Sequence, residues 1–157
     1  MPLLLRTVKQ NRWFKAEAKP FLANGDVPAD CLGDMSTSEN LLSVWELEEN
    51  RSNLERVVRA VVIGRNNIEN MGYIIFDSSV LAGVGIEILN NPGGSADSGA
   101  NVWHRDLRLS GNKMVALVKA ILESGEEAGQ ILKLHMKELV QQGIDQGELP
   151  QHLKKKL

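Results

Sequence analysis

The residues best suited to chemistry lie where a polar loop runs into a predicted strand. His104 and Asp106 are two positions apart, so on a β-strand their side chains point to the same face. A carboxylate beside an imidazole fixes its tautomer and raises its basicity, as general bases and metal ligands both require. The pair predicts a catalytic site in which His104 is the base or ligand and Asp106 orients it or acts as a second ligand.

Three further residues are candidate ligand-binding residues. Asp97 and Asn101 belong to the loop before the pair, residues 90–101, whose turn-forming composition offers backbone N–H groups to an anion. Asp77 ends a predicted buried strand, where open α/β sheets place ligand sites. An enzyme would require Asp77 to share a concave surface with His104 and Asp106.

Each candidate also has an ordinary structural interpretation. Any half-exposed strand shows an alternating polar face, and an aspartate after a strand commonly caps the next turn. Zinc-ligand spacing is absent, and the glycines at 83 and 85 lack the third glycine of a dinucleotide loop, since Ile88 stands there. The sequence therefore predicts no metal site and leaves any cofactor unknown.

Hydrophobic periodicity predicts the elements that position these residues. Alternating or continuous apolar runs predict strands over residues 3–8, 41–47, 73–76, 85–89 and 102–109. Stripes at helical spacing predict helices over residues 53–63, 112–123 and 126–142, with a shorter helix or irregular segment over 13–22. The order predicts an α+β, or irregular α/β, fold: a small mixed sheet with helices packed on it and a two-helix C-terminal segment.

Length and composition limit the class of protein. A chain of 157 residues fits one domain, and we expect a single globular domain over residues 1–145 and a loose tail over 146–157. A net charge of −2 argues against a nucleic-acid-binding surface. Cys31 is the sole cysteine, which excludes an intramolecular disulfide and favours the cytoplasm. No apolar run approaches the length that spans a membrane.

The last predicted helix carries apolar residues around a wide arc. Its stripe consists of Leu132, His135, Met136, Leu139 and Val140, with Ile131 and Leu134 partly off it. Such a helix must bury more than one side, and in a small chain the second side can meet another subunit. We therefore expect a small intracellular binding or regulatory module that associates with itself or another protein through this helix. The alternative is a small metal- or nucleotide-dependent enzyme with its site around the 90–106 loop and strand.

Overall fold

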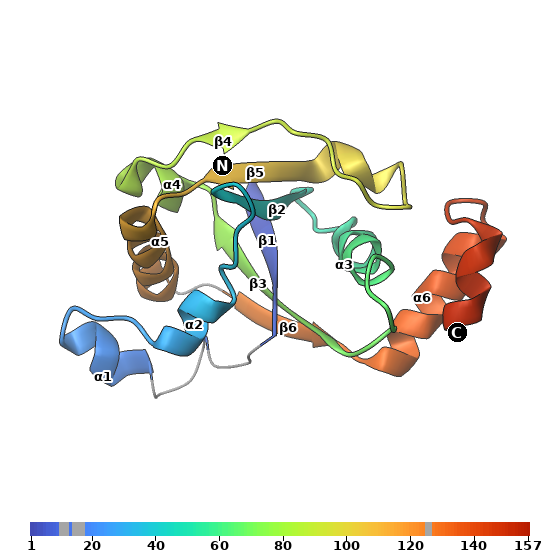
Figure 1. Cartoon of the computed structure of the whole chain (residues 1–157), viewed down its shortest axis with the longest axis horizontal. Coiled ribbons are helices and arrows are strands. Elements are labelled where there is room, and N and C mark those ends of the chain that lie inside the picture. Colours follow the sequence, from blue (N-terminus) through green and yellow to red (C-terminus); the bar gives the residue numbers. More distant parts are fainter. Residues whose placement is uncertain (10–12, 14–17, 125–126) are drawn as a thin grey trace.

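The computed structural model describes residues 1–9, 13, 18–124 and 127–157. Six strands form one sheet in the order β4-β5-β2-β1-β3-β6, with β4 and β6 at its two edges (Figure 1). The strands are β1 (Leu3–Val8), β2 (Leu41–Leu47), β3 (Met71–Asp77), β4 (Ile88–Leu89), β5 (His104–Arg108) and β6 (Glu127–Ile131). The α+β class is confirmed. Every pairing among the described residues is antiparallel, whereas a mixed sheet of parallel and antiparallel strands was expected. Hydrophobic periodicity indicates which faces of a strand are buried but not the direction in which the strand runs.

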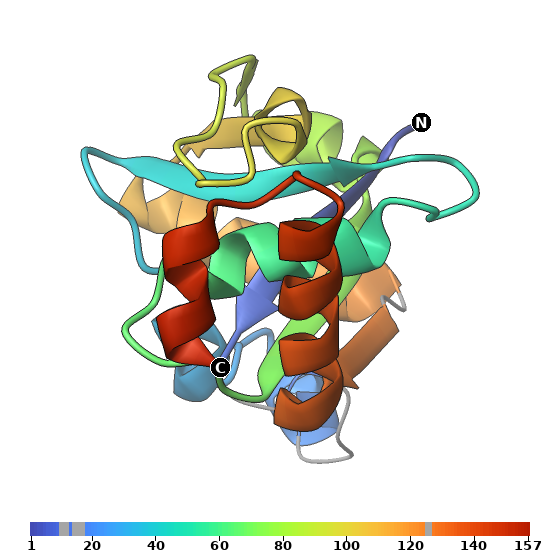
Figure 2. The ribbon, with the colours of Figure 1, turned by 90° about the vertical axis from the view of Figure 1, so that its right-hand side faces the viewer.

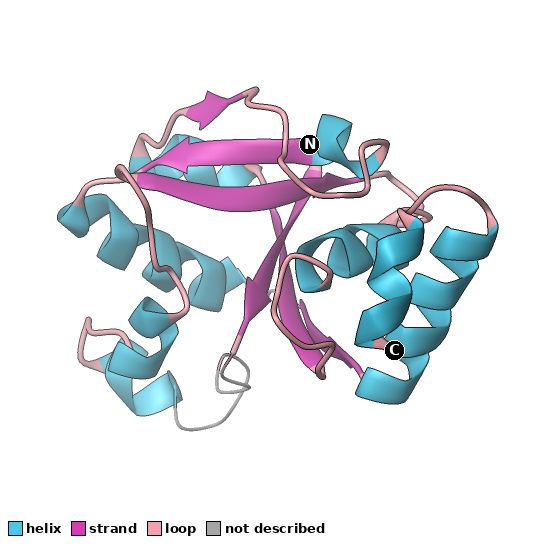
Figure 3. Ribbon diagram, turned by 45° about the vertical axis from the view of Figure 1, so that its right-hand side comes forward, coloured by secondary structure: helices cyan, strands magenta, loops and turns pink. Residues whose placement is uncertain are grey.

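Helices cover both faces of the sheet and give a three-layer arrangement (Figure 3). One face carries α3 (Leu54–Val62), α6 (Lys133–Asp145) and the 3₁₀ helix η2 (Gln151–Lys156). The opposite face carries α2 (Ala29–Gly33), α4 (Ser79–Val84) and α5 (Gly111–Ser124), with α1 (Ala18–Ala23) beside α5. The 3₁₀ helix η1 (Ala100–Trp103) leads into β5. The predicted helix over 13–22 includes positions 14–17, which lie outside the described residues.

Each face of the sheet has its own hydrophobic core, which explains the strand sequences. On β2, Leu42 and Val44 pack on the α5 face, whereas Trp45 and Leu47 pack on the α3 face. Alternate residues of a strand point to opposite faces, so apolar residues at both sets of positions require cover on both sides. The strands predicted at 3–8 and 41–47 are confirmed with their predicted bounds.

Strand β6 replaces the first part of the helix predicted over 126–142. Residues Glu127–Ile131 pair with β3, and α6 begins at Lys133; residue 126 and the predicted boundary at 125 lie outside the described residues. The segment is poor in strand-forming residues, so the pairing with β3 decides its conformation rather than local propensity. The expected two consecutive helices are therefore α5 and α6 with an edge strand between them.

The segment between β3 and β5 also differs from its prediction. Residues Ser79–Val84 form α4, a helix that the sequence pattern did not predict, and Gly85 ends this helix with a left-handed φ of 67°. Glycine adopts that conformation without the Cβ penalty of other residues. The strand predicted over 85–89 is reduced to the two residues of β4.

The C-terminal residues 146–157, expected to be a loose tail, pack against the α3 face of the sheet. Figure 2 shows η2 alongside α6, and the side chains of Leu149 and Leu153 are buried in the core that α3 and α6 share. The Lys156 ammonium donates a hydrogen bond of 2.8 Å to the carbonyl oxygen of Ile63, just beyond α3. Gly147 supplies a left-handed φ of 74° that reverses the chain between α6 and η2. The glycine thus marks a turn and not a loss of structure.

Within the described part of the chain, no helix is both long and apolar enough to cross a membrane.

Candidate functional site

The predicted catalytic pair is brought together on β5. Nε2 of His104 lies 3.7 Å from Oδ1 of Asp106, and the two side chains are 11% and 12% exposed. The imidazole also meets the indole of Trp45 edge-on, with ring centroids 5.1 Å apart. Both groups are thus close to one another, as the spacing predicts, but little of either reaches solvent.

Asn91 contacts polar atoms of both His104 and Asp106. Its carbonyl oxygen lies 2.8 Å from Nδ1 of His104, and its side-chain amide donates a 2.8 Å hydrogen bond to Oδ2 of Asp106. The Ser43 hydroxyl lies 3.5 Å from the other carboxylate oxygen. These contacts fasten the start of the 90–101 loop to β5. In this arrangement the pair holds the chain together, and the imidazole is turned toward its own loop.

Asp97 forms the centre of an ion-pair network buried under that loop. Its carboxylate is inaccessible to solvent and accepts hydrogen bonds of 2.8 and 2.9 Å from Arg56 and 2.7 Å from Arg59. Arg59 also bonds to Glu148 at 2.5 Å and to the Leu139 carbonyl at 3.3 Å. One carboxylate therefore joins the loop to α3, and through Arg59 to α6 and the turn before η2. This predicted ligand residue has its bonding capacity filled by the chain itself.

The same network makes the stability of the fold depend on pH in the acid range. Burial by itself raises the pKa of Asp97, but hydrogen bonds from Arg56 and Arg59 outweigh it, so the pKa lies below its ordinary value. A carboxyl whose pKa is lower in the folded chain than in the unfolded chain, about 3.9, stabilises the fold above that pH. This contribution is lost as the pH falls through the folded-state pKa.

At pH values below about 4 we expect the free energy of unfolding to decrease, and we expect Asp97 to account for part of this decrease. Urea unfolding of the wild type and Asp97→Asn across pH 3–7 at constant ionic strength measures this part, because the amide does not titrate. The variant should show the weaker pH dependence. Parallel profiles for the two proteins would show that Asp97 makes no such contribution.

Asn101 organises the loop from within. Its side-chain oxygen accepts a 2.9 Å hydrogen bond from the backbone N–H of Ser95, and its amide donates a 3.0 Å bond to the Ser95 carbonyl. The Ser95 hydroxyl in turn donates to the Ala60 carbonyl of α3 at 2.7 Å. Asn101 and Asp97 therefore lie in one loop and fix its shape and its position on α3.

Asp77 stands apart from the other candidates. It ends β3, which β1 and β2 separate from β5, and its side chain accepts a 2.8 Å bond from the backbone N–H of Ser79. This backbone hydrogen bond holds the pKa of the Asp77 carboxyl below its ordinary value. Asp77 therefore caps the turn that follows β3, which is the ordinary structural interpretation of an aspartate after a strand. Among the described residues, no group of three His, Cys, Asp or Glu side chains is arranged to hold a metal ion.

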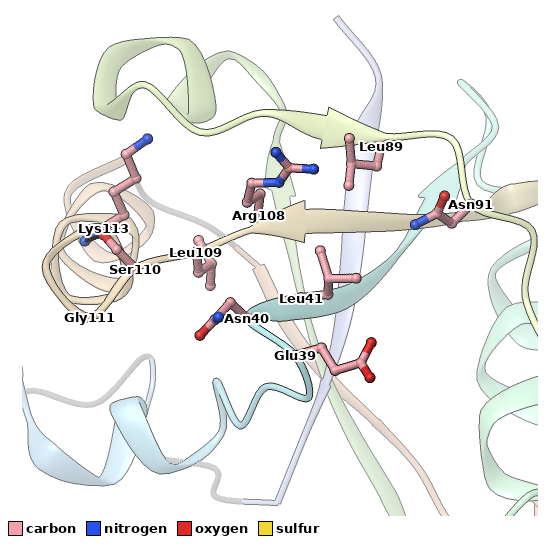
Figure 4. Close-up of a pocket in the computed structure, with 10 residues that line it drawn as sticks. All are labelled: Glu39, Asn40, Leu41, Leu89, Asn91, Arg108, Leu109, Ser110, Gly111 and Lys113. Carbon is pink, nitrogen blue, oxygen red and sulfur yellow. Dashed lines mark hydrogen bonds between the residues drawn. The ribbon is translucent and has the colours of Figure 1, made fainter.

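A cavity of about 1090 Å³ opens between the start of β2, the end of β5 and the first turn of α5 (Figure 4). Arg108, Ser110 and Lys113 are among the residues that line it. Arg108 lies 3.5 Å from Glu87, and the Lys113 ammonium donates to the Gly85 carbonyl at 2.6 Å. Both cations are thus engaged within the chain, and Glu39 adds an opposing charge to the lining.

Two apolar residues of the predicted last helix remain exposed where β6 meets α6. Met136, Leu139 and Val140 are buried in the core, and α6 also contacts η2. Leu132 and Leu134 remain 58% and 74% exposed. Within the described residues β6 pairs with β3 along one side, and no strand lies along its outer side. We name this edge (Glu127–Ile131), with Leu132 and Leu134, the β6–α6 surface.

Contacts within the chain hold this edge strand in place. Both terminal guanidinium nitrogens of Arg51 bond to the Glu127 carboxylate, and a methyl group added at Gly129 would clash with Oη of Tyr73. The tyrosine on β3 therefore lies directly over the glycine opposite it. At the other end, the Lys133 backbone N–H donates to the Asn70 side chain at 2.6 Å. Contacts within the chain therefore hold this strand at both of its ends.

Comparison with known proteins gives no relative: no protein-family model matches the chain, and neither a curated protein nor a solved structure does so.

Proposed function

We propose that this protein is a small intracellular binding or regulatory module that acts by protein–protein association at the β6–α6 surface. One observation carries the proposal: a preformed sheet edge, with no neighbouring strand among the described residues, lies beside two exposed leucines. An open edge offers a row of backbone donors and acceptors to an added strand, and large exposed apolar side chains mark contact sites.

The placement of the predicted site residues favours association over the enzyme alternative. A catalytic base must reach its substrate. His104 and Asp106 are about nine-tenths covered and bonded to Asn91, whereas Asp77 lies three strands away in the sheet. The partner would be this protein itself or another, as the sequence predicts, but the contact includes an edge strand as well as the start of the last helix.

Site-specific photo-crosslinking in the cells that make the protein tests the proposal. A photoreactive amino acid at position 134 should give discrete adducts, because Leu134 lies on the β6–α6 surface. The matched control is position 115, where Val115 is 42% exposed, because α5 packs on the face of the sheet opposite to α6. Absence of adducts from position 134, or the same adducts from both positions, would refute the proposal.

A further inference from the structure

The outer edge of β6 is exposed and short. Glu127, Ala128 and Gln130 are exposed, whereas Ile131 is buried in the core. Alternation along the strand places Ala128, Gln130 and Leu132 on one face and Glu127, Gly129 and Ile131 on the other. The extended backbone continues through Leu132, whose ψ is 151°, before the chain turns into α6.

The sequence of this edge is complementary to itself when read in the opposite direction. Residues 127–133 are Glu-Ala-Gly-Gln-Ile-Leu-Lys. If two copies pair antiparallel about Gln130, Glu127 of one copy lies opposite the start of α6 of the other, whose first residue is Lys133. In the same register Ala128 lies opposite Leu132. At each end of the paired segment Ala128 and Leu132 thus form a cross-strand pair of a small and a large side chain, the kind of pair that stabilises a sheet. Beyond it, the opposite charges of Glu127 and Lys133 face each other.

This register also respects the two faces of the strand. Residues directly opposite in an antiparallel pair lie on the same face, and each of these pairs joins positions that share a face. Leu132, 58% exposed in one copy, would be covered by the second. A two-fold axis uses the same patch on both subunits, and a patch with this self-complementarity satisfies that requirement.

Because β6 is already fixed by Arg51, Tyr73 and Asn70, little conformational freedom remains to be lost on pairing. The Arg51 bonds to Glu127 lie within one copy, and Lys133 of the second copy would add a second cation to that carboxylate. The opposite edge, β4, has two residues and offers a much shorter row of backbone groups.

We infer that the occupant of the β6–α6 surface is a second copy of this chain, paired β6 to β6 in antiparallel register about Gln130, so that the two sheets become one. The inference rests on the proposed function and names its partner. It makes the functional unit a symmetric dimer.

Cysteine crosslinking of the purified full-length protein tests the register. Gln130→Cys places two thiols opposite each other across the axis, within the separation a disulfide bridges. Ala128→Cys is the matched control, because it is exposed on the same face of the same strand. In this register its two copies lie about 14 Å apart, four residues of strand rise, which is beyond reach. The native Cys31 is buried and should not interfere.

Under mild oxidation we expect Gln130→Cys to form a covalent dimer and Ala128→Cys to remain uncrosslinked. Sedimentation velocity of the wild type should show a species of twice 17.3 kDa. Circular dichroism of both reduced variants confirms that they are folded. A monomer at all concentrations, or crosslinking at position 128 instead of 130, overturns the inference. If the wild type is monomeric while position 134 crosslinks to a different protein, self-pairing is wrong and the proposed function stands.

Discussion

Replacing Asp97 with alanine is expected to lower the free energy of unfolding by about 3–5 kcal/mol. The carboxylate is fully buried, and its loss leaves the Arg59 guanidinium buried with Glu148 as its remaining carboxylate partner. A buried charge that loses its partner keeps the full cost of its desolvation. Arg56, 31% exposed at its side chain, would lose its bidentate partner as well.

Urea denaturation followed by circular dichroism measures this loss. Asp145→Asn provides the control, because Asp145 is an exposed aspartate of α6 whose side chain accepts a hydrogen bond from Gln141 one turn earlier. It should change the free energy of unfolding by about 0.5 kcal/mol or less. A similar small effect for both variants would show that the network around Asp97 does not hold the loop to α3.

Leu153→Ala is expected to cost about 2–5 kcal/mol, the range for truncation of a buried leucine. The side chain is 2% exposed and packs in the core that α3 and α6 share. The same denaturation experiment measures the loss, with the exposed neighbour His152→Ala as its matched control. A loose C-terminal tail would instead make the two variants equal, so this comparison distinguishes a packed η2 from a frayed one.

The sequence predicted the central strands because their signal is local. Leu41–Leu47 alternates over seven residues, and both of its faces are apolar enough to require cover. The helix that became α3 was predicted from its valine stripe, with bounds within one residue of the structure. In each case hydrophobic period and backbone conformation agree, and no distant residue is needed to decide the outcome.

The elements that were missed depend on contacts far away in the chain. Strand β6 contains Ala128, Gly129 and Gln130, which have little strand preference, and takes its conformation from β3 more than fifty residues earlier. The packing of the C-terminal residues depends on two leucines, Leu149 and Leu153, which reach the core that α3 and α6 share only because the chain reverses at Gly147.

The candidate site shows the same contrast between local signals, which the sequence reveals, and distant contacts, which it does not. The spacing of His104 and Asp106 predicted their proximity, which is a property of one strand. The partners of Asp97 are 38 and 41 residues away on α3, so nothing near Asp97 in the sequence showed that it binds two arginines. Arg59 in particular is buried, which its position outside the valine stripe of α3 does not predict.

Hydrogen exchange at the two edges of the sheet tests most directly whether β6 is the association surface. Amide exchange of Glu127–Ile131 would be followed by mass spectrometry in dilute and concentrated protein, spanning the dissociation constant found by sedimentation. We expect exchange in β6 to slow as concentration rises, because paired backbone N–H groups are protected, while exchange in β4 stays constant. Unchanged exchange in β6 across that range, or equal slowing at both edges, would contradict association through this surface.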